Sequence, residues 1–353
     1  MSSRPDRKNL RDFTLEELKG IVKGLGQTPY RAGQLYRWLF QKGARSVDEM
    51  TDISKEFRSA LKEAGYHVGT LDVARTQTSA DGTVKLLLAL ADGVKVESVL
   101  IPGEKRLTLC VSTQAGCALG CRFCLTGMAG AGRNLKPSEL IGQVLAASLL
   151  VKNGFVKEHT RITNVVLMGM GEPLLNYDNV VRFLGVLTDP EGMGFSSSRV
   201  TVSTAGIVPG IKGLGRDTKV NLAVSLNATT DEVRTLIMPV NKKYPIKTLL
   251  GSLRAYPLPP RRLITIEYVL IKGVNDSTGD AERLVKLLKG VPCKINLIPL
   301  NPFSGSEFKR PETSAIGAFQ KILFNAGYTA LLRESKGNDI LAACGQLRGE
   351  KSS

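Results

Sequence analysis

The chain has 353 residues, of which 42% are hydrophobic and 23% are charged. These proportions are those of an ordinary globular protein, and they argue against a disordered chain, a collagen-like repeat or a disulfide-rich miniprotein. Lys and Arg number 48 against 32 Asp and Glu, which gives a net charge of +16 and favours a polyanionic partner. The length allows one large domain, or a core domain with a small appendage.

The first residues and the cysteine content bear on the location of the protein. MSSRPDRKNLRDFTLEELKG contains no apolar signal region, and no later segment offers about 18 uninterrupted apolar residues. We therefore expect a soluble, cytoplasmic protein with no membrane partner. In such a protein the six cysteines indicate metal or redox chemistry rather than a framework of disulfides.

The first hundred residues combine helical and hairpin patterns. A capping box at Thr14 and Glu17 opens an amphipathic helix, and a second helix is predicted over residues 31–40. Strand-like runs at 85–89 and 95–101 are separated by an Ala-Asp-Gly turn, as in a β-hairpin. These patterns predict a small accessory module in this part of the chain.

From residue 107 onward, apolar β-branched runs alternate with helical segments. The strand-like runs lie at 107–113, 164–170, 199–204, 220–226, 263–271, 294–300 and 329–335. Strands that alternate with helices predict a parallel α/β architecture. In such folds the active residues gather at the carboxyl ends of the strands.

The positive charge is concentrated in the second half of the chain. Residues 201–300 hold 15 basic and 7 acidic residues, against 16 and 13 in residues 1–100. Six of the basic residues form a cluster in the sequence: Lys242, Lys243, Lys247, Arg254, Arg261 and Arg262. They would suit a face that contacts phosphates, and they would equally suit a solvated surface.

Three cysteines follow the first strand-like run of the core. The sequence GCALGCRFC spaces Cys117, Cys121 and Cys124 as C-x3-C-x2-C on a glycine-bearing loop. A [4Fe-4S] cluster normally takes four cysteine ligands, so three leave one iron open to a small molecule. S-adenosyl-L-methionine would fit that role, because its amino and carboxylate groups can chelate the open iron and one electron can cleave its sulfonium to a radical.

Zinc is the alternative metal for this loop. A zinc site needs a fourth ligand, which would be Cys110, Cys344 or His159. Its usual pattern is two separated C-x2-C pairs, and the triplet departs from that pattern. Cys293, by contrast, enters a strand-like run and is predicted to be a small core residue.

The cysteine triplet, with an aromatic residue before its last member, resembles the motif of the radical S-adenosylmethionine superfamily. The resemblance implies a partial, six-stranded (β/α) barrel over residues 103–338, with the last strand-like run as an addition. It also implies a [4Fe-4S] cluster and bound S-adenosyl-L-methionine as the cofactors.

Four further motifs lie at predicted strand ends. Gly171, Glu172 and Pro173 follow the second run in MGMGEPLLN, a loop whose backbone and carboxylate would hold the ammonium group of the cofactor. The third, fourth and sixth runs end near Ser203, Ser225, Leu226, Asn227 and Asn301. Each polar residue alone would equally suit a helix cap. Their occurrence at neighbouring strand ends favours a binding site.

The C-terminal segment RESKGNDILAACGQL places Cys344 between small residues, with a glycine on either side along the segment. Together with the other motifs, it makes the sequence similar to the RlmN family of bacterial dual-specificity RNA adenine-C2 methyltransferases, over nearly the whole chain. The resemblance implies an RNA-binding accessory module over residues 1–102, a radical core over 103–338, and a segment over 339–353 that carries a methyl-accepting cysteine.

The matching positions imply roles for individual residues. The cluster ligands of the family correspond to Cys117, Cys121 and Cys124, and its cofactor-binding positions to Gly171, Glu172, Ser203, Ser225, Leu226, Asn227 and Asn301. Cys344 corresponds to the methyl-carrying cysteine, Cys110 to its thiol partner and Glu97 to the proposed base. Asn227 departs from the family pattern, because many relatives have histidine at this position.

The implied chemistry uses two molecules of S-adenosyl-L-methionine per turnover. One methylates the Cys344 thiolate, and a radical from the second removes hydrogen from the S-methyl group. The methylene radical adds to adenine C2, an electron-poor carbon with no nucleophilic lone pair, and forms a covalent protein–RNA adduct. Loss of the C2 proton and attack by Cys110 on Cys344 release methyladenosine and leave a disulfide.

The family resemblance also implies the substrates. These are an adenosine in the peptidyl-transferase region of 23S rRNA and the adenosine that follows the anticodon in some tRNAs, each extruded into the barrel mouth. We expect a monomer that receives electrons from a donor such as flavodoxin. Two alternatives stay open: the sister family of the Cfr type, which methylates adenine C8, and a non-catalytic, zinc-stabilised RNA-binding protein. Pro173 favours the C2 group.

Overall fold

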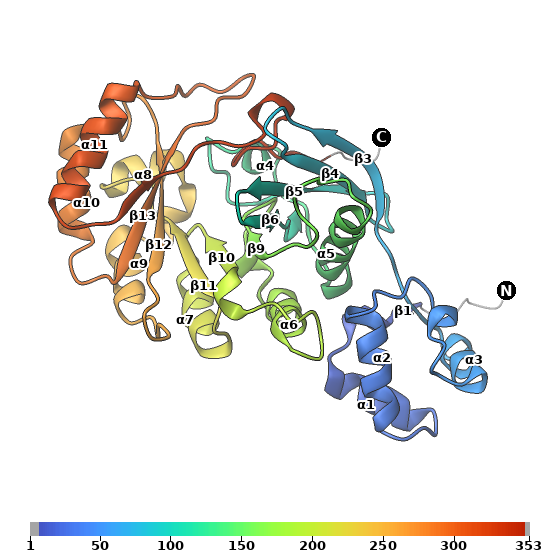
Figure 1. The fold of residues 1–353 in the computed structure, drawn as a ribbon. Coiled ribbons are helices and arrows are strands. Elements are labelled where there is room, and N and C mark those ends of the chain that lie inside the picture. Colours follow the sequence, from blue (N-terminus) through green and yellow to red (C-terminus); the bar gives the residue numbers. More distant parts are fainter. Residues whose placement is uncertain (1–6, 350–353) are drawn as a thin grey trace.

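The chain folds around one large mixed sheet, seen here in a computed structural model that describes residues 7–349 (Figure 1). Its parallel strands are β6 (Arg106–Cys110), β9 (Asn164–Leu167), β10 (Val200–Thr204), β11 (Asn221–Ser225), β12 (Ile264–Leu270), β13 (Cys293–Pro299) and β14 (Ala330–Leu332). Each pairs in parallel with the next in this series. The order confirms the predicted parallel α/β core, with β14 added beyond the six barrel strands.

Helices connect these strands, as parallel pairing requires. They are α5 (Pro137–Lys152), α6 (Tyr177–Thr188), α7 (Val208–Asp217), α8 (Asp231–Ile237), α9 (Ile246–Arg254), α10 (Thr278–Leu287) and α11 (Thr313–Asn325). Shorter elements in the connections are β7 (Gln114–Ala115), α4 (Leu125–Met128), β8 (Arg133–Asn134), η3 (Pro173–Leu175), η4 (Ser197–Arg199) and η5 (Pro239–Lys242), and η6 (Asn338–Ile340) lies in the C-terminal segment after β14. The apolar sides of the strands and helices pack together, and residues such as Phe183, Leu222 and Phe319 are buried in the resulting core.

The predicted hairpin extends the barrel sheet and is not a separate layer. β3 (Asp72–Thr78), β4 (Val84–Ala89) and β5 (Lys95–Gly103) are antiparallel, and β5 pairs with β6. Within residues 7–349 the sheet thus has ten strands, in the order β14-β13-β12-β11-β10-β9-β6-β5-β4-β3. Gly93 supplies the positive φ of 83° that the turn between β4 and β5 requires.

The N-terminal helices form a small module that packs against α5 and α6 (Figure 1). Its elements are β1 (Lys8–Asn9), η1 (Leu10–Asp12), α1 (Leu15–Gly24), α2 (Tyr30–Phe40), η2 (Val47–Glu49), α3 (Lys55–Glu63) and β2 (Tyr66–His67). The predicted capping box is confirmed, with the Thr14 hydroxyl and the Glu17 carboxylate each accepting a backbone N–H from the other residue. The Tyr36 hydroxyl donates to Asp189 at 3.0 Å and ties the module to the end of α6.

The helices of the described region are too short or too polar to span a lipid bilayer. Crossing the apolar interior of a membrane takes about 20 consecutive apolar residues in a helix. Among residues 7–349, no helix is both long enough and apolar enough to do so.

Candidate active site

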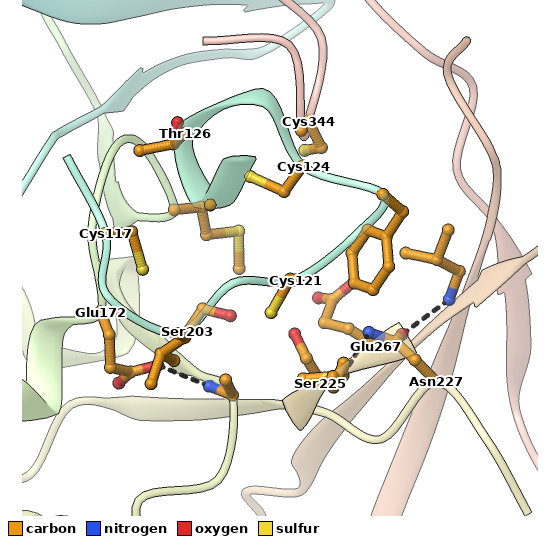
Figure 2. Close-up of a pocket in the computed structure, with 18 of the residues that line it drawn as sticks. Cys117, Cys121, Cys124, Thr126, Glu172, Ser203, Ser225, Asn227, Glu267 and Cys344 are labelled. Carbon is orange, nitrogen blue, oxygen red and sulfur yellow. Dashed lines mark hydrogen bonds between the residues drawn. The ribbon is translucent and has the colours of Figure 1, made fainter. Parts of the chain in front are cut away.

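A cavity opens at the carboxyl ends of the parallel strands. It has a volume of about 1040 Å³ including space open to solvent, and we call it the mouth cavity. Of the residues predicted for the site, it is lined by Cys117, Cys121, Cys124, Gly171, Glu172, Ser203, Ser225, Asn227, Asn301 and Cys344 (Figure 2). Residues from five separate connections and from the C-terminal segment are therefore brought together as predicted.

Three predicted residues do not line the mouth cavity. Leu226 is buried in the core, and only its backbone is engaged nearby, through a hydrogen bond from its N–H to the Glu267 carbonyl at 3.0 Å. Cys110 lies in an adjoining cavity. Glu97 lines neither cavity, because the C-terminal segment covers its carboxylate.

The cysteine loop runs between β7 and α4 and is held by close backbone contacts. The N–H of Cys117 donates to the Gly130 carbonyl at 2.9 Å. Gly116 has a φ of 111°, and a Cβ on it would lie 2.8 Å from the same carbonyl oxygen, so this position requires glycine. The glycines of the motif thus let the chain fold back closely enough to present three thiols to one cavity.

The thiols of this loop are a suitable donor set for an iron–sulfur cluster. Burial raises the pKa of Cys117 to about 11 and raises that of Cys121 further, so both favour the protonated state until a cationic metal centre binds them. Among residues 7–349, no three His, Cys, Asp or Glu side chains converge closely enough to hold a single metal ion. The three thiols lie around the wall of the mouth cavity instead (Figure 2). Three thiolates on one wall match the ligand chemistry of a [4Fe-4S] cluster.

The Glu172 carboxylate ties two of the loops together. It accepts hydrogen bonds from the N–H groups of Leu174 at 3.0 Å and of Ala205 at 2.7 Å, and so links the loop after β9 to the loop after β10. Burial raises its pKa to about 7, against the effect of these hydrogen bonds. Each oxygen thus accepts one of these backbone hydrogen bonds and keeps a further lone pair. The contact of this carboxylate with the ammonium group of the cofactor stays a prediction.

Asn227 fixes the geometry between β11 and β12. It has a φ of 57°, in the left-handed region that asparagine tolerates better than most residues. Its side-chain oxygen accepts the N–H of Val269 at 2.8 Å, as Figure 2 shows, and its amide nitrogen lies 3.2 Å from the Met238 sulfur. Both polar atoms of the Asn227 side chain thus help to hold the strand ends.

Three charged residues of the site were not predicted. Arg333, which directly follows β14, lines both the mouth cavity and the adjoining cavity. Arg234 on α8 is completely buried and donates to the carbonyls of Ala205, Ser225 and Leu226. Glu267 on β12 lines the mouth cavity with a buried carboxylate. Arg234 lies in the helical sequence DEVRTLI among other charged residues, so the sequence does not indicate that it is buried. Glu267 is the single acidic residue in the apolar run ITIEYVLI, and sequence analysis could have used this as a sign of a buried carboxylate.

Cys110 and Cys344 meet in a second cavity, which we call the thiol cavity, of about 760 Å³ including space open to solvent. Cys344 lines both cavities, and the two share the wall formed by Cys124, Met168 and Asn301. Burial raises the pKa of Cys110 to about 12. The surrounding protein also raises the pKa of Cys344, and the Arg333 guanidinium opposes that shift. The structure therefore brings the two predicted partner cysteines to one space.

The C-terminal segment that carries Cys344 is held on both sides. The Cys344 carbonyl accepts from the Asn301 side chain at 3.2 Å, and the Gly345 carbonyl accepts from the N–H of Leu125 at 2.7 Å. Glu97 accepts the N–H groups of Arg348 at 2.8 Å and Gly349 at 3.2 Å. Lys85 Nζ lies 3.2 Å from the other carboxylate oxygen of Glu97, in a buried ion pair.

The remaining thiol and imidazole candidates lie away from this centre. Cys293 begins β13 half-buried, lines neither cavity, and has a pKa that burial raises to about 11. His159, in the connection between α5 and β9, also lines neither cavity. Of the candidates for a fourth zinc ligand, Cys344 shares the mouth cavity with the triplet and Cys110 lies in the adjoining one.

Comparisons with known proteins agree with this geometry. Residues 8–66 match the ribosomal RNA large subunit methyltransferase N-terminal domain, and residues 111–288 match the radical SAM superfamily. A crystal structure of a radical SAM methyltransferase from Sphaerobacter thermophilus superposes with a TM-score of 0.89 at 43% identity, covering 96% of this chain and 99% of that one.

Curated relatives extend the match over almost the whole chain. A protein of Geotalea uraniireducens named dual-specificity RNA methyltransferase RlmN is 51% identical over 344 residues, or 98% of this chain and 97% of its own length. A protein of the same name from Desulfosudis oleivorans is 55% identical over 323 residues, or 91% of this chain and 85% of its own length. The chain therefore belongs to the RlmN family of dual-specificity RNA methyltransferases, within the radical SAM superfamily.

Proposed function

We propose that this enzyme methylates C2 of adenosine in RNA by way of an S-methyl group on Cys344. The observation that carries the proposal is the shared space: Cys344 lines both the mouth cavity, with the cysteine triplet, and the thiol cavity, with Cys110. One thiol can thus face the methyl donor on one side and a second thiol on the other. Relatives that bear the RlmN name support C2, rather than C8, as the carbon that is methylated.

The residues of the mouth cavity would hold the cofactors. Cys117, Cys121 and Cys124 would bind a [4Fe-4S] cluster, and the loops of Gly171, Glu172, Ser203, Ser225, Leu226, Asn227 and Asn301 would bind S-adenosyl-L-methionine. When bound, this pair supplies the methyl group and the one-electron chemistry that C2 of adenine requires. The chain itself would hold the cluster next to the strand ends. It would also keep Cys344 beside the cluster and beside S-adenosyl-L-methionine.

Cys344, Cys110 and Glu97 would act in turn on the substrate side. Cys344 accepts the methyl group and bonds through it to the adenine. Cys110 then attacks the Cys344 sulfur and closes a disulfide as the methylated base leaves. Glu97 accepts the proton from C2, which requires the backbone of Arg348 and Gly349 to release its carboxylate first. Two molecules of S-adenosyl-L-methionine are used for each methyl group delivered.

The substrate is a polyanion, in keeping with the net charge of +16. We propose 23S rRNA and tRNA as the substrates, with residues 1–102 as the RNA-binding accessory module, 103–338 as the radical core and 339–353 as the cysteine-bearing segment. The enzyme would act as a cytoplasmic monomer that draws electrons from a donor such as flavodoxin.

Peptide mass spectrometry tests the carrier role of Cys344. Protein produced with S-adenosyl-L-methionine available should carry one methyl group on Cys344. Cys344→Ala should keep the brown iron–sulfur colour, which dithionite bleaches, and should form no methyladenosine. Cys293→Ala is the matched control, because this half-buried cysteine lines neither cavity. Active protein with an unmodified Cys344, or methyl transfer by the alanine variant, would refute the proposal.

A further inference from the structure

Glu267 lines the mouth cavity, and one of its carboxylate oxygens is buried without a hydrogen bond. Its residue is 4% exposed, and its Oε1 accepts a hydrogen bond from the Asn296 side chain at 3.0 Å. Its Oε2 is buried and has no hydrogen-bond partner among residues 7–349. Figure 2 shows Glu267 among the side chains that surround the cavity. The hydrogen bond from Asn296 fixes the carboxylate group, so the direction of Oε2 is set before any ligand arrives.

An unpaired oxygen of this kind costs folding free energy. A buried carboxylate oxygen without a hydrogen bond is unfavourable, because water would solvate it in the unfolded chain. Burial accordingly raises the pKa of Glu267, and the nearby Arg333 opposes that shift. A donor that arrives with a ligand would relieve the cost, so the position is suited to binding and poorly suited to a purely structural role.

The other carboxylate in the lining of the mouth cavity is Glu172, and each of its oxygens already accepts a backbone N–H group. Among residues 7–349, Glu267 is therefore the carboxylate of this lining that has an oxygen with no hydrogen bond. A donor group on the cofactor would satisfy that oxygen.

The order of strands indicates which part of the cofactor meets Glu267. The cysteine loop follows β6 and the Gly171 loop follows β9, so the amino-acid end of a cofactor chelated there lies at that side of the barrel. β12 lies three strands beyond β9, and Glu267 pairs in register with Ser225 on β11. A ligand that extends from the cysteines across the strand ends brings its nucleoside to β11 and β12. Ribose hydroxyls are the donors that a nucleoside offers at its sugar.

We propose that Glu267 Oε2 accepts a hydrogen bond from a ribose hydroxyl of S-adenosyl-L-methionine and thereby positions the nucleoside end of the cofactor. The inference rests on the proposed function only in placing this cofactor in the mouth cavity. A hydrogen bond from a hydroxyl to a carboxylate is stronger than one between neutral groups, so its loss should be measurable in binding.

Equilibrium binding to the anaerobic, cluster-loaded enzyme tests the proposal. The probes are S-adenosyl-L-methionine, 5′-methylthioadenosine, which keeps the ribose and lacks the amino-acid end, and the 2′-deoxy and 3′-deoxy forms of 5′-methylthioadenosine. Glu267→Gln should weaken binding of the first two by the same factor, about 10- to 100-fold. Glu282→Gln, on the exposed side of α10, is the matched control and should bind all probes as the wild type does.

The deoxy probes separate a direct contact from a general disturbance. Wild-type enzyme should bind one of them more weakly than 5′-methylthioadenosine, and Glu267→Gln should lose that discrimination. Wild-type enzyme that binds both deoxy forms as tightly as the parent compound overturns the inference without any variant, even if Glu267→Gln does not fold. Unchanged affinity of a folded, cluster-loaded Glu267→Gln for S-adenosyl-L-methionine overturns it as well. The proposed function fails separately, by the absence of a methyl group on Cys344.

Discussion

Arg234 is a buried cation whose ligands are mostly backbone oxygens. Its guanidinium joins the strand end of β10, through Ala205, to that of β11, through Ser225 and Leu226. Burial lowers its pKa to about 10, which still leaves it charged at neutral pH. One side chain thus holds two of the loops that form the mouth cavity, and the charge is balanced by oriented carbonyl dipoles.

Replacing Arg234 with Leu should destabilise the protein strongly. Three carbonyls lose their donor, and each orphaned buried group costs about 1–3 kcal/mol, so the free energy of unfolding should fall by at least about 3 kcal/mol. Arg254→Leu is the control, because its guanidinium also donates to carbonyls, of Leu287 and Lys289, but at an exposed position where water can replace it. Denaturant unfolding measures the free energy of unfolding of both variants. An equal loss of this free energy in the two variants would show that Arg234 does not organise the loops.

Cys110 is required in the proposed path only after the carbon–carbon bond has formed. Cys110→Ala should therefore keep methylation of Cys344 and attack on the base, and should accumulate a covalent protein–RNA adduct. On a denaturing gel this species would run as a retarded, nuclease-sensitive protein band. Cys293→Ala should turn over normally. If Cys110 is only a packed strand residue, its alanine variant would give free protein and a normal yield of methyladenosine.

The spacing of motifs in the sequence predicted which residues gather at the strand ends. It did not predict the hydrogen bonds that these residues form. The cysteine triplet and Asn301 were predicted to meet because parallel strands bring their carboxyl ends to one edge. Cys344 was placed with them only through the family resemblance of the C-terminal segment. The engagement of the Glu172 carboxylate by backbone N–H groups depends on how two loops approach each other. That approach is set by long-range packing, which no local pattern encodes, and the burial of Arg234 was missed for the same reason.

The C-terminal segment after β14 contains the short η6, and the antiparallel strands β3–β5 and their turns hold this segment in place. Asp81, in the turn between β3 and β4, accepts the N–H of Gly337 at 2.9 Å, and Asp339 accepts the hydroxyl of Ser79 at 2.6 Å. At its other end the segment is bound by Glu97. Strands β3–β5 thus connect the barrel sheet to the hydrogen-bonded segment that carries Cys344, a role that the hairpin pattern alone did not indicate.

Asp81→Asn should loosen this segment. Hydrogen bonds lower the pKa of Asp81 from 3.8 to about 2 although desolvation opposes them, so the folded state favours the carboxylate. The stabilisation is complete above pH 3.8 and is lost as the pH falls toward 2. Amide exchange over residues 337–349 should be faster in the variant at neutral pH, and the difference in melting temperature from wild type should shrink below pH 3.8.

Asp92→Asn is the matched control for this experiment. Asp92 lies in the neighbouring turn, between β4 and β5, and pairs with Arg133 instead of the C-terminal segment. The Asp92→Asn variant should leave amide hydrogen exchange over residues 337–349 unchanged. The hairpin would have no holding role if the two variants behaved alike, or if Asp81→Asn differed from wild type by the same amount at pH 3 as at pH 7.

The basic cluster predicted from the sequence divides between two ends of the whole molecule. Lys242 ends η5 and Lys243 follows it. Pro239 of η5 lies beside Gly120 of the cysteine loop, and the N–H of Arg122 donates to the Ile237 carbonyl at 3.1 Å. Arg262 lies two residues before β12 and donates to the carbonyls of Ser197 and Lys219, at the amino ends of the strands. The first pair is thus next to the cysteine loop of the mouth cavity, where an extruded base would enter.

RNA binding should therefore depend on Lys242 and Lys243 more than on equal charge elsewhere. Replacing both with Glu removes two candidate phosphate contacts, which should reduce the slope of log affinity against log salt by about 1.5. The control replaces Lys286 and Lys289 with Glu and so makes the same change in net charge. Both residues are exposed, and they lie at and just beyond the C-terminal end of α10, which precedes the amino end of β13. Filter binding across a salt series measures both slopes. If the two double variants lose the same affinity with the same slope, the net charge attracts RNA without a defined face, and the mouth of the barrel has no special part in gripping it.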